Sequence, residues 1–419
     1  MHILGVIAEF NPLHTGHEYL IRHLRLETGA KYCVVVMSGD YVQRGEPAFF
    51  SKSLRTMSAL LSGADLVLEL PLSVATGSAE YFAEGAISLL HRLGCVTHLG
   101  FGSESGDIQA LLSAGKLLSA EPENYRSLLQ ENLKKGTNFP KARYEALSAS
   151  LTSQRRDQDF SAFLSLLSTP NNILGTEYCK ALYKLESSIR PVTLKRLGAG
   201  YHEDLPEASV YASASGLRKV LLSAQTSDDT ETLLQSYVPK DCRSLYRDAL
   251  QQKQYVTFND FYLPLYHTLQ YTDAASLARF QDVTPEFAER LLNQFRQCSC
   301  ITELCDALKS KNLTAARIRR SLLHILLRQS KDTLTVEKEQ GLSLYARILG
   351  FRREAGPLLS EIDRRASIPL VSKLADASKT LSPLAFAQLE QTRKASELYR
   401  TAMSGAKSGS EYAQRIIIL

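Results

Sequence analysis

The first half of the chain alternates short apolar runs with longer segments of helical spacing. Apolar, mostly β-branched runs at 3–8, 32–37, 65–71, 96–102 and 192–195 predict buried strands. Apolar residues recur at helical intervals at 51–62, 78–93 and 107–119, and again from Leu20 until Gly29. Strands that alternate with helices in this way predict an α/β fold with a doubly wound parallel sheet.

From about residue 225 the alternation fades, and helical patterns follow one another to the C-terminus. Leucines and alanines fit the apolar faces of packed helices at Leu245, Ala249, Ala288, Leu291, Leu292, Leu322, Leu323, Leu326 and Leu327. We therefore expect two domains, a doubly wound one over residues 1–225 and a helical one over residues 226–419.

The composition is that of an ordinary globular protein, with 44% apolar and 22% charged residues among 419. No apolar run is long enough to span a bilayer, and no basic leader precedes an apolar segment, so we expect a cytoplasmic protein without membrane contact. The net charge of +5 permits a nucleic-acid partner without requiring one. Nothing in the sequence indicates an obligate protein partner.

The seven cysteines are scattered and odd in number, which argues against a disulfide framework. Cys298, Cys300 and Cys305 cluster, but their spacing matches no zinc motif. We expect buried, reduced cysteines and no metal site built from them.

The residues between the first predicted strand and the following helix carry the clearest candidate chemistry. They are Asn11-Pro12-Leu13-His14-Thr15-Gly16-His17. The first N–H groups of a helix lack partners and its dipole favours anions, so this turn suits phosphates. His14 and His17 lie on one face of the first turn, where their rings can donate to phosphoryl oxygens. We expect the pair to bind a triphosphate and to stabilise charge as its α-phosphate is attacked.

Further polar residues follow the later strands, at the edge where doubly wound sheets bind ligands. Arg44 lies in the loop after the second strand, Gly102 ends the fourth, Arg196 follows the fifth, and Asn171 precedes a helical run. Ser213, Ser215 and Arg218 lie where another helix starts, and form a second candidate anion site. For each of these positions a purely structural role is the alternative to ligand binding, namely a solvated arginine, an ion pair or a helix cap. The same two interpretations apply to Lys52 and Arg55 near the start of the helix after Arg44.

The segment His14-Thr15-Gly16-His17 resembles the HxGH signature of the nucleotidyltransferase superfamily, which includes adenylyltransferases and class I aminoacyl-tRNA synthetases. A series of motifs in one order makes the resemblance specific. They are Asn11-Pro-Leu-His-Thr-Gly-His17, Val42-Gln-Arg-Gly-Glu-Pro47, Phe101-Gly-Ser-Glu104, Pro170-Asn-Asn-Ile-Leu-Gly175, Lys195-Arg196 with Gly198-Ala-Gly-Tyr-His202, and Ser213-Ala-Ser-Gly-Leu-Arg218. Together they are similar to the tRNA(Met) cytidine acetate ligase family. The second half matches through Tyr345-Ala-Arg-Ile-Leu-Gly350. The chain departs from the family pattern at Gly39-Asp40-Tyr41, where Gly-Asn-Phe is expected, and at Ser51, where Asp is expected.

The resemblance implies an ATP-dependent ligase that works in two steps. Acetate attacks the α-phosphate of ATP to give acetyl-adenylate and pyrophosphate, with Mg²⁺ expected on the phosphates. The exocyclic amine of the wobble cytidine in elongator tRNA(Met) then takes the acetyl group, which leaves AMP and N-acetylcytidine. The implied catalytic residues are His14 and His17. The implied ATP contacts are Ile7, Ala8, Glu9, Phe10, Asn11, Pro12, Leu13, His14, Thr15, Gly16, His17, Glu18, Tyr19, Leu20, Gly102, Asn171 and Arg196. Residues 1–225 would then be the catalytic domain.

Two basic helical stretches are candidates for the tRNA surface. One is Arg317-Ile318-Arg319-Arg320 with His324 and Arg328, and the other is Arg347-Ile348-Leu349-Gly350-Phe351-Arg352-Arg353. Basic faces can follow a phosphate backbone, and an exposed Tyr345 or Phe351 can stack on a base. Solvated charges with core aromatics are the alternative. At the level of function, a nucleotidyltransferase that makes a small cofactor and a non-catalytic RNA-binding protein remain open.

Overall fold

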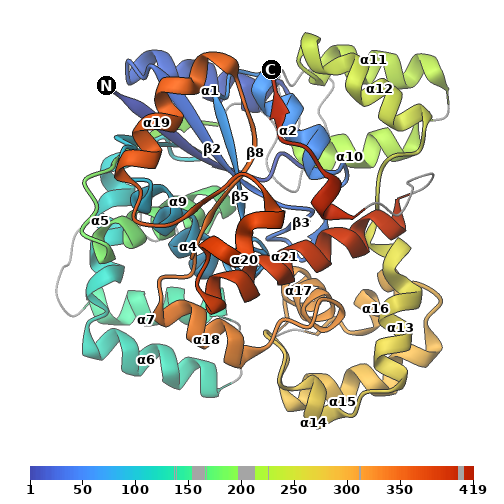
Figure 1. Cartoon of the computed structure of the whole chain (residues 1–419). Coiled ribbons are helices and arrows are strands. Elements are labelled where there is room, and N and C mark those ends of the chain that lie inside the picture. The colour runs from blue at the N-terminus through green and yellow to red at the C-terminus, as the bar shows by residue number, and fades with distance from the viewer. Residues whose placement is uncertain are drawn as a thin grey trace.

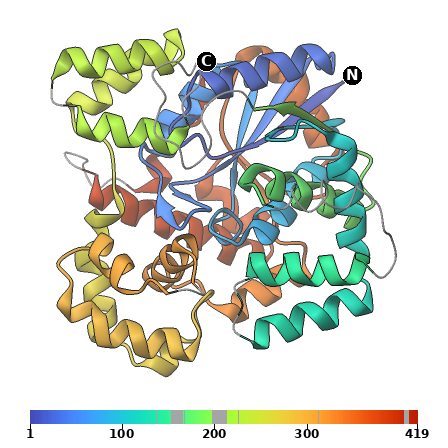
Figure 2. The same cartoon turned by 180° about the vertical axis from the view of Figure 1, so that it is seen from behind.

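A central sheet with helices on both faces forms the body of the protein, and two groups of helices lie beside it (Figures 1 and 2). The computed structural model describes residues 1–135, 137, 139–152, 166, 168–196, 213–224, 226–310, 313–403 and 410–419. The strands are β1 (Ile3–Ala8), β2 (Tyr32–Ser38), β3 (Tyr41–Val42), β4 (Glu46–Pro47), β5 (Leu66–Leu70), β6 (His98–Ser103), β7 (Arg190–Lys195), β8 (Ala346–Phe351), β9 (Leu370–Val371) and β10 (Ile417–Ile418).

The helices of the first half are α1 (Thr15–Glu27), α2 (Lys52–Leu61), α3 (Leu72–Ala75), α4 (Ala79–Arg92), α5 (Ile108–Ala120), α6 (Glu123–Lys134), α7 (Phe139–Thr152) and α9 (Pro170–Lys184). Those of the second half are α10 (Ala214–Ser223), α11 (Ser227–Tyr237), α12 (Arg243–Gln251), α13 (Tyr262–Gln270), α14 (Ala274–Leu277), α15 (Pro285–Gln294), α16 (Ile301–Ala307), α17 (Ala315–Leu326), α18 (Lys331–Glu339), α19 (Gly356–Arg365), α20 (Ala377–Thr380) and α21 (Pro383–Ala402). Short 3-10 turns lie at Lys240–Cys242, Phe258–Phe261, Phe295–Gln297, Arg353–Ala355, Leu374–Asp376 and Glu411–Ala413.

The predicted α/β fold is confirmed, and the early elements lie where the hydrophobic pattern placed them. Each of the predicted strands is present, with ends shifted by at most two residues. The helices predicted at 51–62, 78–93 and 107–119 are α2, α4 and α5. They begin just after Ser51, Ser78 and Asp107, whose side chains accept hydrogen bonds from N–H groups of the first turn.

The sheet has the order β10-β8-β5-β2-β1-β6-β7, with β9 beside β8. Strands β5, β2, β1, β6 and β7 are parallel, whereas β8 pairs antiparallel with β5. The expectation that the chain stays helical from residue 226 onward is therefore wrong for β8, β9 and β10. The run Ala346–Phe351 is short, apolar and buried, which does not distinguish a core strand from a core helix without its neighbours.

Both faces of the sheet are buried, as a parallel sheet requires. Along β2, Val34 and Val36 point into the core beneath α4 and α9, while Val35 and Met37 point into the core beneath α1 and α2. After β1 the chain turns towards one face of the sheet, and after β6 it turns towards the opposite face. That edge is where a doubly wound sheet opens a crevice.

Helices α10–α17 form two groups that are each packed against the sheet body. Helices α10–α12 bury Leu217 and Tyr246 against Phe49 and Phe50, which precede α2. Helices α13–α17 share a core with Tyr399 of α21 and with Tyr41. Figure 1 shows these groups on one side of the sheet, with α21 running alongside them. In the part of the chain that the structure describes, no helix is both long and apolar enough to cross a membrane.

Candidate active site

A cavity of about 220 Å³ opens at the carboxyl ends of β1 and β6. Its lining comes from β1 with the turn and helix α1 that follow it, the β3–β4 hairpin, α4, the end of β6, α9, the residue after β7 and the start of α10. The lining residues that were predicted for the site are Ile7, Ala8, Glu9, Phe10, Asn11, His14, His17, Leu20, Arg44, Gly102, Asn171, Arg196, Ser213, Ser215 and Arg218. The other lining residues are Val6, Gln43, Glu46, Phe82, Phe101, Leu174, Tyr178 and Ala214.

The two histidine rings lie against each other at the N-terminus of α1, with an angle of 33° between their planes. Their ring centroids are 3.8 Å apart. His14 caps the helix, since its Nδ1 accepts from the N–H of Gly16 at 3.1 Å, and His17 Nδ1 accepts from the N–H of His14 at 3.3 Å. Because both Nδ1 atoms are acceptors, the proton of each neutral ring lies on Nε2. His14 Nε2 is buried and has no hydrogen-bond partner among the described residues, so the site contains a donor that a ligand can satisfy.

Burial keeps these rings neutral. Desolvation lowers the pKa of His14 to about 3, and the nearby Arg196 guanidinium adds to this effect. Desolvation also lowers the pKa of His17 well below its ordinary value, with further contributions from His14 and Arg196. Both imidazoles therefore act as neutral hydrogen-bond donors near pH 7, beside the unpaired N–H groups of the helix start.

One side of the cavity lies at the ends of β6 and β7. Arg196 follows β7, and its backbone N–H donates to Ser103 of β6. A Cβ on Gly102 would lie 3.2 Å from Cγ of Arg196 and from Cδ1 of Leu20, so this glycine lets the cavity pass between them. Glu104 holds Asn171, because its carboxylate accepts from the Asn171 N–H at 3.1 Å and from Nδ2 at 2.6 Å. This leaves the amide oxygen as the acceptor that Asn171 can offer a ligand.

Asn171 lies in the first turn of α9 rather than before the helix, which begins at Pro170. Glu104 also accepts from the N–H of Asn172 at 2.8 Å and from the hydroxyl of Thr169 at 3.1 Å. Glu104 thus performs the capping that the sequence suggested for the asparagines. Its place in the motif Phe101–Glu104 was the signal from which that role could have been inferred.

The opposite side of the cavity is the β3–β4 hairpin after β2, together with the start of α10. Arg218 donates to the Asn11 carbonyl at 2.5 Å and pairs with Glu46 at 2.7 Å, so it joins the turn after β1 to the hairpin. Glu9 Oε1 accepts from the N–H of Gln43 at 2.8 Å. Ser213 caps α10 by accepting from the N–H of Gly216, which is the structural alternative weighed for this serine, and it also lines the cavity.

Arg55 stabilises the edge of the sheet on which the site is built. Its guanidinium is buried and donates to the carbonyls of Glu9 at 2.8 Å, Phe50 at 2.9 Å and Ser38 at 2.9 Å, and also to that of Gly39. Neither interpretation from the sequence, a phosphate contact or a solvated charge, describes this residue. Satisfying three carbonyls at the ends of β1 and β2 and a fourth just before α2 is a structural task that a planar guanidinium performs well.

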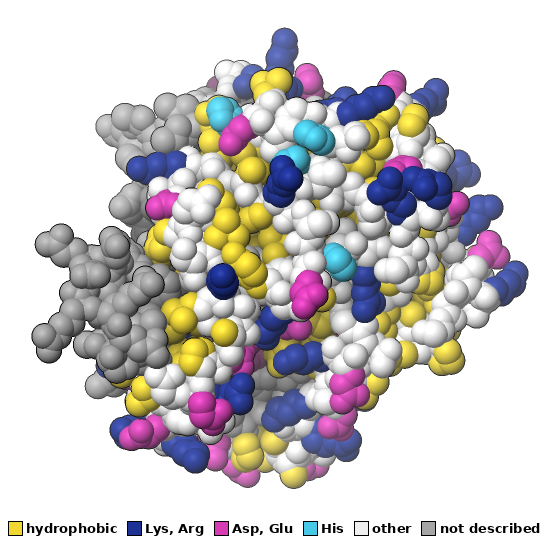
Figure 3. Space-filling view, turned by 90° about the vertical axis from the view of Figure 1, so that its left-hand side faces the viewer, with side chains coloured by type: hydrophobic (Ala, Val, Ile, Leu, Met, Phe, Trp, Pro, Cys, Tyr) yellow, Lys and Arg dark blue, Asp and Glu magenta, His cyan; other side chains and the backbone are white. Residues whose placement is uncertain are grey.

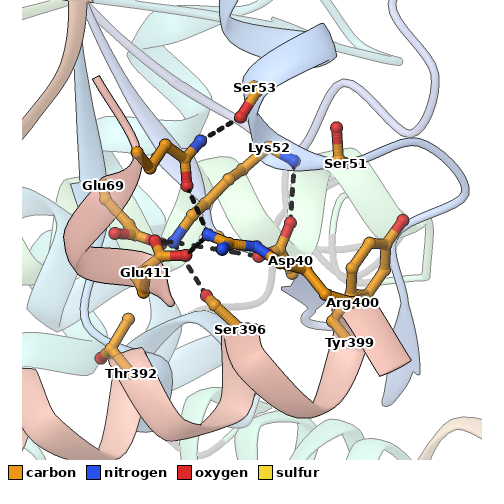
Figure 4. A network of polar contacts seen from close by, with 12 residues as sticks. Asp40, Ser51, Lys52, Ser53, Glu69, Thr392, Ser396, Tyr399, Arg400 and Glu411 are labelled. Atoms are coloured by element: carbon orange, nitrogen blue, oxygen red, sulfur yellow. Dashed lines mark hydrogen bonds and ion pairs between the residues drawn. The ribbon is translucent and has the colours of Figure 1, made fainter. Parts of the chain in front are cut away.

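Lys52 is also buried, and it belongs to a network of ion pairs that connects the start of α2 with β5, β8 and α21 (Figure 4). Its Nζ lies 2.8 Å from Glu69 of β5 and also contacts Glu411, while Arg347 of β8 pairs with both carboxylates at 2.7 and 2.8 Å. Arg400 of α21 completes the network at Glu411. The interpretations of Lys52 as a phosphate contact or a solvated charge are therefore wrong.

Six predicted residues do not line the cavity. Leu13 is buried, and its carbonyl accepts from the Tyr246 hydroxyl at 3.0 Å. Glu18 pairs with Arg22 at 2.6 Å, and the Tyr19 ring lies beside His23, so both side chains contact the next turn of α1. The others are Pro12, Thr15 and Gly16. Gly198-Ala-Gly-Tyr-His202 lies outside the described residues.

Several residues proposed for tRNA contact are buried. Tyr345 and Arg347 belong to the core and to the ion-pair network, and His324 lies between the carbonyls of Gln281 and Thr76. Arg320 pairs with Asp282 at 2.8 Å. A tRNA contact through Tyr345, Arg347 or His324 is therefore wrong, because β8 is an inner strand and α17 packs into the molecule.

Among the described residues, neither the cysteines nor the face of the molecule that Figure 3 shows adds a second candidate site. Cys298, Cys300 and Cys305 are only partly buried, which corrects the expectation of burial, and Cys300 is the N-cap of α16. In the described ranges, His, Cys, Asp and Glu side chains form no group of three that would hold a metal. The described part of the face in Figure 3 mixes basic, acidic and apolar side chains without a continuous basic patch.

The site fits a nucleoside triphosphate. The unpartnered Nε2 of His14, the start of α1 and the guanidinium group of Arg196 provide donors and positive charge for phosphates. Gly102 leaves room for a base or ribose to approach the backbone. No carboxylate cluster is present to hold Mg²⁺ among the described residues, so such an ion would bind chiefly to the phosphates.

The fold and the histidine pair define a nucleotidyltransferase, and a model of the HIGH Nucleotidyl Transferase family matches residues 1–415. The tRNA(Met) cytidine acetate ligase of Acetivibrio thermocellus is 35% identical, with 100% of both chains covered. That of Clostridium perfringens strain SM101 is 38% identical, with 98% of each chain covered. A crystal structure of Thermotoga maritima TmcAL bound with alpha-thio ATP superposes with a TM-score of 0.91 at 29% identity over the whole of both chains. The chain therefore belongs to the tRNA(Met) cytidine acetate ligase family, as its motifs predicted.

Proposed function

We propose that this protein is an ATP-dependent ligase that acetylates the wobble cytidine of elongator tRNA(Met). Acetate attacks the α-phosphate of ATP, which gives acetyl-adenylate and pyrophosphate. The exocyclic amine of the cytidine then attacks the acetyl carbon, and AMP leaves. The observation that carries the proposal is the neutral histidine pair, with the unpartnered Nε2 of His14 beside the start of α1 in a cavity with Arg196.

The first step needs positioning and charge stabilisation rather than a covalent enzyme intermediate. Nε2 of His14 and of His17 would donate to oxygens of the α-phosphate and the leaving pyrophosphate. Gly102, Asn171 and Arg196 would hold the nucleoside and its phosphates on the β6–β7 side. Mg²⁺, bound to the phosphates, would neutralise further charge.

The tRNA would approach from the side of the two helical groups. The β3–β4 hairpin supports this assignment, because it lines the cavity and also packs against α17, where Arg319 donates to the Arg44 carbonyl at 3.4 Å. Arg218 of α10 borders the cavity as well. A tRNA held by these helices would have its anticodon loop at the hairpin.

The test is to follow AMP and pyrophosphate release from ATP with acetate, with and without tRNA(Met), for the wild type and for His17→Ala. We expect release to require acetate and AMP release to accelerate with tRNA. His17→Ala should lower acetate-dependent pyrophosphate exchange by about 10²–10³-fold, the effect of removing one aligned donor. His23→Ala, less than two turns further along α1 and with an exposed side chain, is the matched control and should retain activity.

Other outcomes would overturn the proposal. Pyrophosphate release without acetate would indicate a nucleotidyltransferase with another acceptor. Binding of tRNA without any turnover of ATP would indicate a non-catalytic RNA-binding protein. Equal activity of His17→Ala and His23→Ala would remove the histidine pair from the chemistry.

A further inference from the structure

The two sides of the cavity differ in charge. Two of the lining residues, all of which the structure describes, carry carboxylates, namely Glu9 and Glu46, and both lie on the β2 side with the hairpin. Arg44 and Arg218 on that side offset the two carboxylates, whereas Arg196, beside Gly102 and Asn171, has no carboxylate next to it in the lining. A polyphosphate is attracted by an arginine and repelled by carboxylates, so the nucleotide is better accommodated on the side of Arg196. Carboxylates are, in contrast, the side chains that accept from the exocyclic amine of cytosine. The β2 side therefore suits the acceptor base.

Glu9 is held in place in this half of the cavity. It directly follows β1, and its Oε1 accepts from the Gln43 N–H at 2.8 Å. The backbone carbonyl of Glu9 accepts from Arg55 at 2.8 Å. Phe10, the next residue, has a left-handed backbone (φ 48°), which turns the chain from Glu9 towards the histidines. Glu9 and the histidine pair are thus presented to one cavity from a single short turn.

The other ionisable groups of the cavity are poor proton acceptors. Burial lowers the pKa of His14 to about 3 and that of His17 well below its usual range, so both are weak bases. Burial raises the pKa of Tyr178, which keeps its hydroxyl protonated. Glu46 is engaged by Arg218 at 2.7 Å. Arg44, Arg196 and Arg218 are cations. Glu9 remains, and burial raises the pKa of its carboxyl, which makes the ionised form a stronger base than an ordinary glutamate.

We propose that Glu9 is the general base of the acetyl-transfer step, an inference that rests on the proposed function. The cytidine N4 lone pair attacks the acetyl carbonyl carbon, and the new C–N bond forms as the C–O bond to AMP breaks. The N4 proton passes to the Glu9 carboxylate, and AMP leaves as its anion without needing a proton. The carboxylate also orients the amine by accepting its hydrogen bond before attack.

The surroundings of Glu9 set the pH at which it can accept the proton. Arg44 and Glu46 of the hairpin, Arg218 of α10, Arg55 of α2 and Tyr178 of α9 all interact with its charge. The three arginines favour the carboxylate, whereas burial and Glu46 oppose it, and burial dominates. Acetyl transfer should therefore lose rate as the pH falls and Glu9 becomes protonated, and this loss should begin at a higher pH than for an ordinary glutamate.

The experiment measures the two steps separately in the full-length protein with the variant Glu9→Gln. The amide oxygen of Gln still accepts from the Gln43 N–H, so the local fold is kept. The first step is followed as acetate-dependent exchange of labelled pyrophosphate into ATP without tRNA. The second is followed by adding tRNA(Met) to enzyme-bound labelled acetyl-adenylate in a single turnover. We expect Glu9→Gln to slow transfer by about 10²–10⁴-fold more than it slows exchange, and to lose the acid limb of the pH profile of transfer.

Controls distinguish catalysis from positioning. Glu9→Asp keeps a carboxylate and should recover part of the transfer rate with its acid limb. Glu46→Gln removes the other carboxylate and frees Arg218, so any loss should affect both steps alike. A parallel loss of both steps in Glu9→Gln, or transfer at the wild-type rate, would overturn the role of Glu9. Absence of acetate-dependent exchange in the wild type itself would instead overturn the proposed function.

Discussion

At the scale of single residues, the backbone around His14 determines which ring nitrogen carries the proton. Its Nδ1 is occupied as the cap of α1, so only Nε2 is left to contact a ligand. A protonated ring in this position would place a charge in a buried site next to Arg196. The site therefore uses histidine as a neutral donor whose orientation is fixed by the helix start.

The low pKa of His14 predicts a specific loss of stability in acid. The pKa is about 3 in the folded protein and 6.5 in the reference state, so between these values the unfolded chain binds more protons. The free energy of unfolding should therefore fall as the pH drops below 6.5, by up to about 1.4 kcal/mol per pH unit from this residue. His14→Asn keeps a capping acceptor but removes the titration. Urea unfolding at several pH values should show a shallower decline for this variant, and equal slopes would contradict the assignment.

At the scale of elements, the β3–β4 hairpin connects the cavity to the helical groups. Gln43, Arg44 and Glu46 line the cavity, while Gly45 between them packs on the backbone of α17. Gly45 has φ +79°, and a Cβ there would lie 2.3 Å from the Arg320 nitrogen. A glycine at this position lets one short hairpin contact the ligand site on one side and a helix on the other.

Gly45→Ala should therefore disturb both the fold and the site. We expect the free energy of unfolding to fall by more than about 1 kcal/mol, because the new Cβ would clash with the backbone of α17 and because alanine is strained at this positive φ. ATP binding should weaken as well, since the hairpin has to move. Gly356→Ala is the matched control, because no atom lies within 4 Å of its Cβ position. Urea unfolding and calorimetric titration with ATP measure both effects, and equal behaviour of the two variants would contradict this view of the hairpin.

At the scale of the whole molecule, the buried ion pairs of Figure 4 connect distant parts of the chain. Lys52 of α2, Glu69 of β5, Arg347 of β8 and Glu411 near the C-terminus meet beneath α21. Burial lowers the pKa of Lys52 to about 8, with a further contribution from Arg347, while the carboxylates of Glu69 and Asp40 favour its charged form. The network joins β5, which comes from the first half of the chain, to β8, which comes from the second half.

Lys52→Met should destabilise the protein by about 3–5 kcal/mol, because Glu69 and Glu411 would lose a buried partner. The measurement is the free energy of unfolding in urea. Arg364→Met, which breaks an exposed pair with Glu361, should change it by less than about 1 kcal/mol. If Lys52→Met lowered the free energy of unfolding by as little as Arg364→Met, Arg347 and Arg400 alone would be sufficient to balance the carboxylates.

Local patterns were sufficient to predict the strands β1, β2, β5, β6 and β7 and the helices between them. They failed for β8, because Ala346–Phe351 is a short buried run whose partner, β5, lies far away in the sequence. The motifs also indicated most residues of the cavity, since parallel strands bring their carboxyl ends to one edge. Phe82 and Tyr178 were missed, because nothing in an apolar helix face shows that part of it borders a cavity.

The sequence by itself determined the doubly wound core, the histidine pair at the first strand–helix turn and the family. These depend on residues close together in the chain, where spacing alone controls geometry. Only the tertiary structure decided that Lys52, Arg55 and Arg347 are internal, that the chain returns to the sheet after the helical groups, and that Glu9 faces the cavity opposite Arg196. These depend on contacts between distant segments, and a charged side chain looks the same in a sequence whether its partner is water or a buried carboxylate.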